Sequence, residues 1–424
     1  MTLCFALSLW QVVNRNLRKL HTELQALDSA QQLQDDGLLL YLYGIVQKHI
    51  EDKAGAKSTI ARAVCAYPCC WGAWTDLADL CNQDVDGTVD DLISDLTLPR
   101  SHWIFPFFTA HLGLEMQQSK ESHAVYAQLR QLYPASNYLL LQEANTLYNM
   151  REFEAAAGLF EELLERDPHR VEGMDTYSNV LYVQEDTHRL SYLAQTAYRI
   201  DKFRPETCCI VGNYYSLKAE HEKAVLYFRR ALRLNPHYLA AWTLMGHEYV
   251  EMKNPQAAIE AYRRAVDINP RDYRAWYGLG QTYEILSMPF YALHYYRKTI
   301  SLRPYDPRMW CAAAGCYELL KRPEEAIKCY ERADLNNDRD GIALSKLAKL
   351  YDELGNHNKA AGYYTANLKR RDDDSEGHSG GQETVDALKF LAQYHKDRQN
   401  FDLALEMCSR LLDHNGPGAC KPTV

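Results

Sequence analysis

Large apolar residues recur along this chain at the three- and four-residue spacing of amphipathic helices, and the same arrangement returns every 34 residues. In the clearest block, Trp242, Met245 and Tyr249 form one apolar stripe, and Tyr262 and Ala265 form a second one. The two stripes predict two helices joined by a short turn. Each block is therefore expected to be a helical hairpin, and one hairpin cannot bury its apolar face without a neighbour.

Prolines mark the end of these blocks. Five of them occupy one position of the 34-residue period, which is missed once, at Lys202: Pro134, Pro168, Pro236, Pro270 and Pro304. Proline disfavours helical geometry in the residue before it, so each one ends a second helix. A period of 34 with a closing proline is the signature of the tetratricopeptide repeat. The sequence thus predicts an all-α, tetratricopeptide-repeat helix-hairpin solenoid that winds into a right-handed superhelix.

Two glycines are expected to set how closely the helices of a hairpin approach each other. Gly246 and Gly280 occupy the same position in consecutive repeats, and small Ala258 stands on the facing helix of the first. A bulky residue at either glycine should push the paired helices apart.

The repeat frame divides the chain into six expected segments. These are an apolar and basic N-terminal segment at 1–35, degenerate repeats at 36–136 with an irregular insertion at 82–101, a repeat array at 137–368, a polar flexible loop at 369–383, a last imperfect hairpin at 384–414 and a tail at 415–424.

Composition narrows the classes of partner. The chain has 424 residues, far more than one compact core usually takes, but in a solenoid each repeat contacts only its neighbours. A net charge of -9 argues against nucleic-acid binding, which usually needs a basic surface. No apolar run reaches the ~18 residues of a membrane span, and residues 1–13 lack the basic start and cleavage site of a signal peptide. We expect neither nucleic acid nor membrane as a partner.

The chemistry-bearing residues predict no catalytic, cofactor or metal site. The twelve cysteines fall mostly at repeat positions, which favours reduced thiols, and the Cys65, Cys69, Cys70 cluster lacks metal-ligand spacing. His247 opens like a zinc-binding H-E-x-x-H motif, but Glu251 stands in place of the second histidine. Residues 377–381 satisfy G-x-S-x-G, although they lie in the polar loop rather than between a strand and a helix.

The first helix of each hairpin should line the concave face of the solenoid. The polar and aromatic residues that are expected to point into this groove are Asp175, Asn179, Asn213, His247, Glu251, Arg274, Tyr277, Gln281, Glu284 and Glu318. Carboxylates accept paired hydrogen bonds from a guanidinium group, and a tyrosine ring can stack on it. The groove therefore suits an extended peptide that carries arginine. For any single acidic residue, a role in solubility alone is the alternative.

Repeats that act as chaperone cofactors bind a terminal carboxylate through basic residues at fixed groove positions. The position of Asn213 fits that pattern, but Cys209, Leu244 and Gly278 stand where it needs lysine, asparagine and arginine. This chemistry is therefore not predicted here.

Several stretches go beyond the generic repeat, among them residues 177–183, 206–217, 241–249, 271–286 and 288–291. They include Cys208-Cys209 and Met288-Pro289, which helix packing does not dictate. Over residues 35 to 370 the chain resembles the family of eighth subunits of the anaphase-promoting complex, or cyclosome, a multisubunit ubiquitin ligase.

The resemblance implies a non-catalytic, homodimeric scaffold in nucleus and cytoplasm that contacts other subunits of the complex. It also implies that the groove receives an arginine-containing motif from the N-terminal segment of a coactivator, so that the complex ubiquitinates cell-cycle proteins. Family members have further repeats before the region that begins near Asp36, where this chain has a short apolar segment. A general tetratricopeptide adaptor for chaperones or transport is the alternative function.

Overall fold

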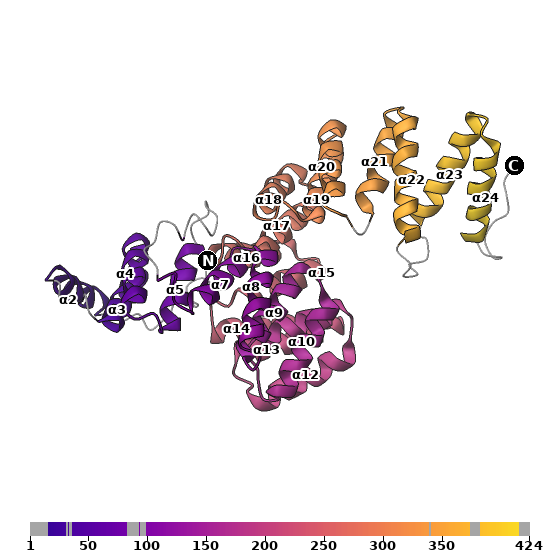
Figure 1. Cartoon of the computed structure of the whole chain (residues 1–424). Helices are drawn as coiled ribbons and strands as arrows, with labels where there is room; N and C mark the ends of the chain where they lie inside the picture. The colour runs from indigo at the N-terminus through magenta and orange to yellow at the C-terminus, as the bar shows by residue number, and fades with distance from the viewer. Residues whose placement is uncertain are drawn as a thin grey trace. The chain divides into compact units, whose positions relative to one another are not determined.

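The computed structural model describes residues 16–30, 33, 36–82, 93, 99–338, 341–373 and 382–414. Over these ranges the chain forms helices and turns without any strand. It divides into two compact units, an N-terminal unit (Met1–Ala275) and a C-terminal unit (Trp276–Val424). Within each unit, consecutive helices pack as hairpins beside the next hairpin (Figure 1). The predicted all-α tetratricopeptide-repeat solenoid is confirmed.

The hairpins follow the predicted frame. The helices of the N-terminal unit are α2 (Leu17–Ser29), α3 (Gly37–His49), α4 (Lys53–Ala66), α5 (Trp71–Asn82), α7 (Phe105–Glu115), α8 (Ser119–Leu132), α9 (Asn137–Met150), α10 (Phe153–Arg166), α11 (Met174–Val183), α12 (Thr187–Ile200), α13 (Pro205–Leu217), α14 (His221–Leu234), α15 (Leu239–Glu251), α16 (Pro255–Ile268) and the start of α17 (Tyr273–Ile285). Those of the C-terminal unit are the rest of α17, then α18 (Pro289–Leu302), α19 (Pro307–Leu319), α20 (Pro323–Leu335), α21 (Ile342–Glu353), α22 (His357–Asp373), α23 (Gln382–Asp397) and α24 (Phe401–His414).

The closing prolines have a second role besides ending helices. In three repeats, a tryptophan in the first helix of the next hairpin donates a hydrogen bond from its indole Nε1 to the carbonyl oxygen of the proline six residues earlier. The bonds run from Trp74 to Pro68 (2.8 Å), from Trp242 to Pro236 (3.0 Å) and from Trp310 to Pro304 (2.8 Å). Each of these prolines lies just beyond the C-cap of its helix, so the bond links the end of one hairpin to the first helix of the next.

The turn inside each hairpin uses one left-handed residue, at the same position of the repeat. The residues with positive φ at this 34-residue interval are Gln117, Arg151, Glu185, Ala219, Lys253, Ser287, Lys321 and Gly355. Only the last is a glycine, although this conformation costs other residues roughly 1 kcal/mol. The packing of the two helices therefore imposes the turn.

The predicted role of the glycines in close helix approach is confirmed. A Cβ atom on Gly246 would lie 2.5 Å from the ring of Tyr262, and one on Gly280 would lie 2.4 Å from the ring of Tyr296. These separations are shorter than any van der Waals contact, so a side chain at either position would displace the ring.

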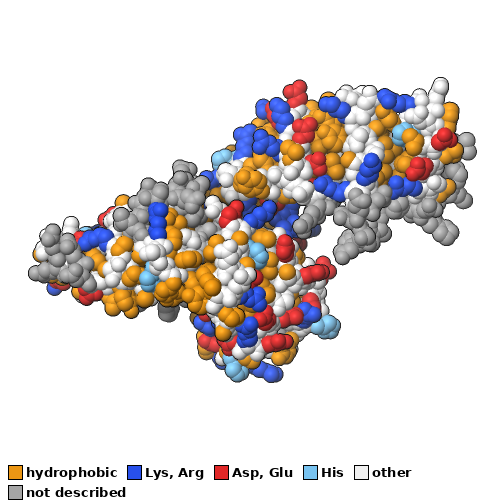
Figure 2. Space-filling model, in the orientation of Figure 1, with side chains coloured by type: hydrophobic (Ala, Val, Ile, Leu, Met, Phe, Trp, Pro, Cys, Tyr) orange, Lys and Arg blue, Asp and Glu red, His pale blue; other side chains and the backbone are white. Residues whose placement is uncertain are grey.

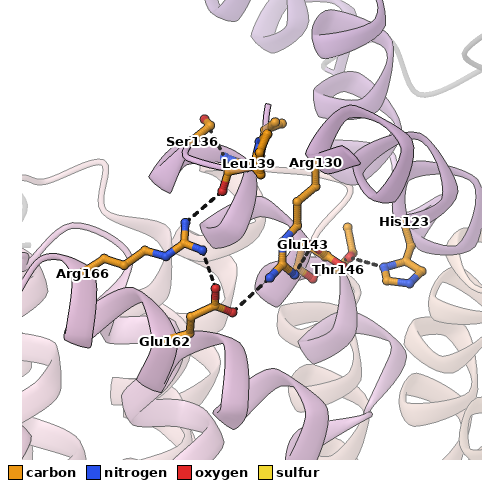
Figure 3. Close-up of polar contacts among 9 residues, drawn as sticks. His123, Arg130, Ser136, Leu139, Glu143, Thr146, Glu162 and Arg166 are labelled. Atoms are coloured by element: carbon orange, nitrogen blue, oxygen red, sulfur yellow. Dashed lines mark hydrogen bonds and ion pairs between the residues drawn. The ribbon is translucent and has the colours of Figure 1, made fainter. Parts of the chain in front are cut away.

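A polar bridge adds to the apolar packing in the N-terminal unit (Figure 3). Arg130 on α8 donates to Glu143 on α9 (2.9 Å) and to Glu162 on α10 (3.0 Å). Glu162 also accepts from Arg166, which donates through its other nitrogen to the carbonyl oxygen of Pro134. One guanidinium group thus joins three helices.

Parts of the expected segmentation fall where the structure describes helices. Helix α2 occupies residues 17–29 of the segment predicted at 1–35, and α22 runs to Asp373, into the segment predicted as a loop at 369–383. Most of the insertion at 82–101, the G-x-S-x-G residues at 377–381 and the tail at 415–424 lie outside the described residues.

Candidate functional site

Two predicted groove residues of the N-terminal unit, Asp175 and His247, interact electrostatically with a third, Arg274, which is the second residue of α17. Its Nε lies 3.0 Å from Oδ1 of Asp272, a carboxylate that is almost completely buried. Asp272 raises the pKa of Arg274, and the guanidinium charge in turn counteracts the raised pKa of Asp175 and lowers that of His247. Asp175 on α11 and His247 on α15 therefore both lie within electrostatic range of Arg274 on α17.

Asp175 is joined to a residue 63 positions later in the chain. The hydroxyl of Tyr238 donates a hydrogen bond of 2.6 Å to Oδ2 of Asp175, and this bond connects α11 to the start of α15, past the intervening hairpin. Burial raises the pKa of Asp175, although the bond from Tyr238 opposes the shift.

His247 lies against Tyr262. Its Nδ1 lies 2.8 Å from the hydroxyl of Tyr262, and the ring meets the tyrosine ring edge-on. Part of the imidazole remains exposed, yet the surrounding protein desolvates it, and with the charge of Arg274 this lowers the pKa of His247 to about 4. Glu251, one turn further along α15, is exposed.

Asn213 and Asn179 bind each other. Asn213 is 2% exposed, and its Nδ2 donates to Oδ1 of Asn179 (2.7 Å) and to Oγ of Ser178 (2.8 Å). The two asparagines thus fasten α13 to α11, and the amide nitrogen of Asn213 is used inside the fold.

Glu248 was missed by sequence reasoning. It is 5% exposed, and its carboxylate accepts a hydrogen bond from Ser216 (2.6 Å) and lies 2.9 Å from Nδ1 of His221. The sequence does indicate this contact, because a glutamate at an otherwise apolar position of a helix needs a hydrogen-bond partner when it is buried.

The C-terminal unit contains a cavity of about 760 Å³ beside α17, α19 and α21. Charged residues of both signs line it, over small and apolar ones: Glu284, Glu318, Glu353, Lys321, Lys346, Lys349, Gly315, Leu319, Leu350 and Pro323. Its volume is in the range of ligand pockets. The cavity includes two predicted groove residues, Glu284 and Glu318.

Tyrosine hydroxyls orient both of these carboxylates. Tyr296 donates to Oε2 of Glu284 (2.7 Å), and Tyr330 donates to Oε1 of Glu318 (2.6 Å). The ring of Tyr277 lies 5.5 Å from that of Tyr296. Tyr277 and Glu284 therefore share one partner, whereas Gln281 is exposed and does not line the cavity.

This arrangement leaves a signal in the sequence. In two consecutive repeats, a glutamate is followed twelve residues later by a tyrosine, Tyr296 or Tyr330, at the position that holds Phe160, Phe228 and Tyr262 in earlier repeats. The hydroxyl is the only addition that distinguishes tyrosine from phenylalanine there, so the pair predicts a hydrogen bond. Three lysines of the lining, Lys321, Lys346 and Lys349, were also missed, because one lies in a turn and two lie on the next repeat.

Within the part of the chain that the structure describes, no group of three histidine, cysteine or acidic side chains could hold a metal ion. No disulfide joins the cysteines there, and none of the described helices is both long and apolar enough to cross a bilayer. Acidic and basic side chains are interspersed on the visible surface of each unit (Figure 2).

Comparison with known proteins identifies the family. The sequence model of "Anaphase promoting complex subunit 8 / Cdc23" matches residues 6–144, and tetratricopeptide-repeat models match 205–238, 246–286, 307–337 and 343–376. Anaphase-promoting complex subunit 8 of Arabidopsis thaliana is 51% identical over 407 residues, which are 96% of this chain and 68% of that protein. The chain belongs to the anaphase-promoting complex subunit 8 family.

The subunit 8 protein of Dictyostelium discoideum is 54% identical over 383 residues, or 90% of this chain and 63% of that protein. The chain thus spans about two thirds of the length of these two relatives. Among solved structures, the crystal structure of the APC/C hetero-tetramer Cut9–Hcn1 matches with a TM-score of 0.63 at 19% identity, over 90% of this chain and 74% of that one, which supports the fold. The family match begins at residue 6, so the resemblance reaches further toward the N-terminus than residue 35.

Proposed function

We propose that this protein is a non-catalytic scaffold subunit of an anaphase-promoting complex. In this role it forms a homodimer, contacts other subunits and receives the N-terminal segment of a coactivator, so that the complex ubiquitinates cell-cycle proteins in nucleus and cytoplasm. Membership of the subunit 8 family and the repeat solenoid support the scaffold role.

The observation that carries the coactivator proposal is the pair of oriented carboxylates in the cavity of the C-terminal unit. Each of Glu284 and Glu318 lines the cavity and has one oxygen fixed by a tyrosine hydroxyl, and the second oxygen of Glu318 lies 3.5 Å from the ammonium group of Lys346. A guanidinium group forms paired hydrogen bonds with such carboxylates, and these bonds are stronger than those between neutral groups. The cavity therefore suits the arginine of an extended peptide.

An exposed apolar turn in the same unit suits a protein neighbour. Met288 is the N-cap of α18, Phe290 and Tyr291 lie in the first turn of that helix, and Phe290 is 69% exposed. These residues belong to a stretch that the hairpin itself does not require, and large exposed apolar side chains are typical of interfaces. We propose this turn as a contact with another subunit.

The peptide part can be tested with the full chain and a fluorescein-labelled peptide that spans the arginine motif of a coactivator N-terminal segment. Fluorescence anisotropy should show at least tenfold weaker binding to Glu284→Lys. Glu260→Lys makes the same charge change at an exposed position of α16, in the other unit, and should bind normally. Equal affinity of both variants would remove Glu284 from the binding site.

The scaffold part needs separate measurements. Light scattering on the purified chain should give a mass of twice 48.9 kDa if it forms a dimer. Affinity purification of the tagged chain from cells should recover a cullin-type subunit together with it. Recovery of chaperones without any ligase subunit would favour the general adaptor.

A further inference from the structure

The cavity of the C-terminal unit has a basic side that the proposed arginine site does not use. Lys321 lies in the turn after α19, and Lys346 and Lys349 lie on α21. Their positions are not basic in the preceding repeat, which has Ser287, Ala312 and Gly315 there. Lys346 and Lys349 are therefore a feature of this cavity rather than of the repeat, whereas the position of Lys321 is also basic in two earlier repeats, at Arg151 and Lys253.

These ammonium groups are weakly engaged within the protein. Lys346 lies 3.5 Å from Oε2 of Glu318, and Lys349 lies 3.9 Å from Asp386, with both lysine side chains more than two fifths exposed. Exposed pairs of this kind contribute about 0–1 kcal/mol. Among the residues that the structure describes, no acidic side chain pairs with Lys321, which is exposed. A ligand can therefore recruit these charges at little cost to the fold.

The charges of the lining are also ordered along the solenoid. Glu284 comes from α17, Glu318 and the following Lys321 come from α19 and its turn, and Lys346 and Lys349 come from α21. The acidic groups thus dominate toward α17 and the basic groups toward α21, where Glu353 is the one acidic residue of the lining. A ligand of one sign would meet repulsion at one end of the cavity.

We propose that this cavity selects an extended peptide that carries charges of both signs, with an arginine over Glu284 and Glu318 and a carboxylate over Lys346 and Lys349. The inference rests on the proposed arginine site and adds a second specificity element to it. An extended peptide with two residues between the charged ones separates their Cα atoms by about 10 Å, so Arg-x-x-Glu and Arg-x-x-Asp represent the proposed motif.

A substitution of Gly315 can test the role of the cavity without disturbing the fold. A Cβ atom added there would meet no atom within 4 Å, so a side chain at this position projects into open space rather than into the core. Gly315 lines the cavity, whereas Gly362 on α22 has equally open surroundings and does not line it. Gly315→Leu should fill the cavity while the fold persists, and Gly362→Leu is its matched control.

The experiment measures fluorescence anisotropy of the full chain with four labelled eight-residue peptides that share glycine ends and an Ala-Ala centre. The four peptides differ in the two residues that flank this centre. The first has Arg before it and Glu after it, the second Arg and Gln, the third Gln and Glu, and the fourth Gln and Gln. The Arg/Glu peptide should bind at least tenfold more tightly than each of the other three. Gly315→Leu should abolish this binding, and Gly362→Leu should retain it, with circular dichroism used to check that both variants are folded.

A charge exchange tests the orientation of the peptide. In Lys346→Glu/Lys349→Glu, a peptide with arginine at both positions should bind better than the Arg/Glu peptide, which reverses the order seen with the unaltered chain. Equal binding of Arg/Gln and Arg/Glu would overturn the second specificity element and leave the arginine site intact. Equal binding of Gln/Glu and Arg/Glu would overturn the arginine site itself. Absence of binding by all four peptides, or normal binding to Gly315→Leu, would overturn the inference.

Discussion

The ring of Tyr296 lies directly against Gly280, so close that a Cβ atom on the glycine would be 2.4 Å from the ring carbon Cε1. The hydroxyl of the same tyrosine donates a 2.7 Å hydrogen bond to Glu284. Helix packing and the position of a cavity carboxylate are thus coupled through one side chain. A substitution of Gly280, which has no polar side chain, should therefore alter the position of the Glu284 carboxylate in the candidate site.

Gly280→Ala should both destabilise the protein and weaken its binding of an arginine peptide. The added methyl group forces the Tyr296 ring to move, and overpacking of this kind costs about 1–3 kcal/mol. Urea denaturation followed by circular dichroism gives the first effect, and anisotropy gives the second. Gly362→Ala, which meets no neighbour, is the control. If Gly280→Ala matched it in both measurements, the coupling would be wrong.

The sequence was sufficient to predict the repeat fold because its period fixes which residues share a position. Trp242 and Pro236 could be placed at the junction between hairpins, although their hydrogen bond was not foreseen. The left-handed turns were not predicted, because Ala219 and Lys253 have no chemical feature in common with glycine. Packing of the paired helices decides their conformation, and that information is distributed over the whole hairpin.

The candidate site was predicted less completely. The register correctly grouped Glu284 with Glu318, since equal positions in neighbouring repeats lie side by side. The same register does not predict when a polar groove residue binds a residue of the neighbouring repeat instead of a ligand. Asn213 is buried because Asn179, one repeat earlier, offers it an acceptor within the fold. A polar residue repeated at 34-residue intervals can thus bind its own counterpart instead of a ligand.

Backbone strain alone should distinguish two glycines that both have open surroundings. Gly355 has a φ of +75°, whereas Gly315 lies within helix α19, and neither would bring a Cβ atom into contact. Gly355→Ala should lose about 1 kcal/mol through left-handed strain. Gly315→Ala should gain up to about 1 kcal/mol from helix propensity. Thermal denaturation of the two variants side by side tests this, and equal shifts would contradict it.

Arg130 should not be replaceable by lysine. Its planar guanidinium group reaches Glu143 and Glu162 at once, from α8 to α9 and α10, and Glu143 is largely shielded from water. A single ammonium group cannot reproduce this fork. Arg130→Lys should therefore lose on the order of 1–3 kcal/mol, because one partly buried carboxylate is left without its hydrogen bond.

The control for this change is Arg189→Lys, at an exposed ion pair with Glu161. Exposed pairs contribute about 0–1 kcal/mol, so its effect on the urea midpoint should be small. Equal midpoints for Arg130→Lys and Arg189→Lys would show that the three-helix bridge adds nothing to stability.

Glu115 should make stability depend on pH in the direction opposite to most carboxylates. Burial, with the charge of Asp79 adding to it, raises the pKa of Glu115 from 4.5 to about 7, against the attraction of Arg274. The folded state therefore binds a proton more tightly than the unfolded state does. Its contribution to stability is fully present below pH 4.5, declines as the pH rises and is lost once the pH passes 7.

Glu115→Gln removes this dependence because the amide stays neutral at every pH. The variant should match the unaltered protein at pH 4.5 and exceed its stability at pH 8, by on the order of 1–3 kcal/mol. Glu121→Gln, at an exposed position on α8, controls for the loss of one carboxylate. Denaturant midpoints of the two proteins at both pH values test this. If the stability difference between Glu115→Gln and the unaltered protein does not grow between pH 4.5 and pH 8, Glu115 ionises in the folded protein without the loss of stability that its burial predicts.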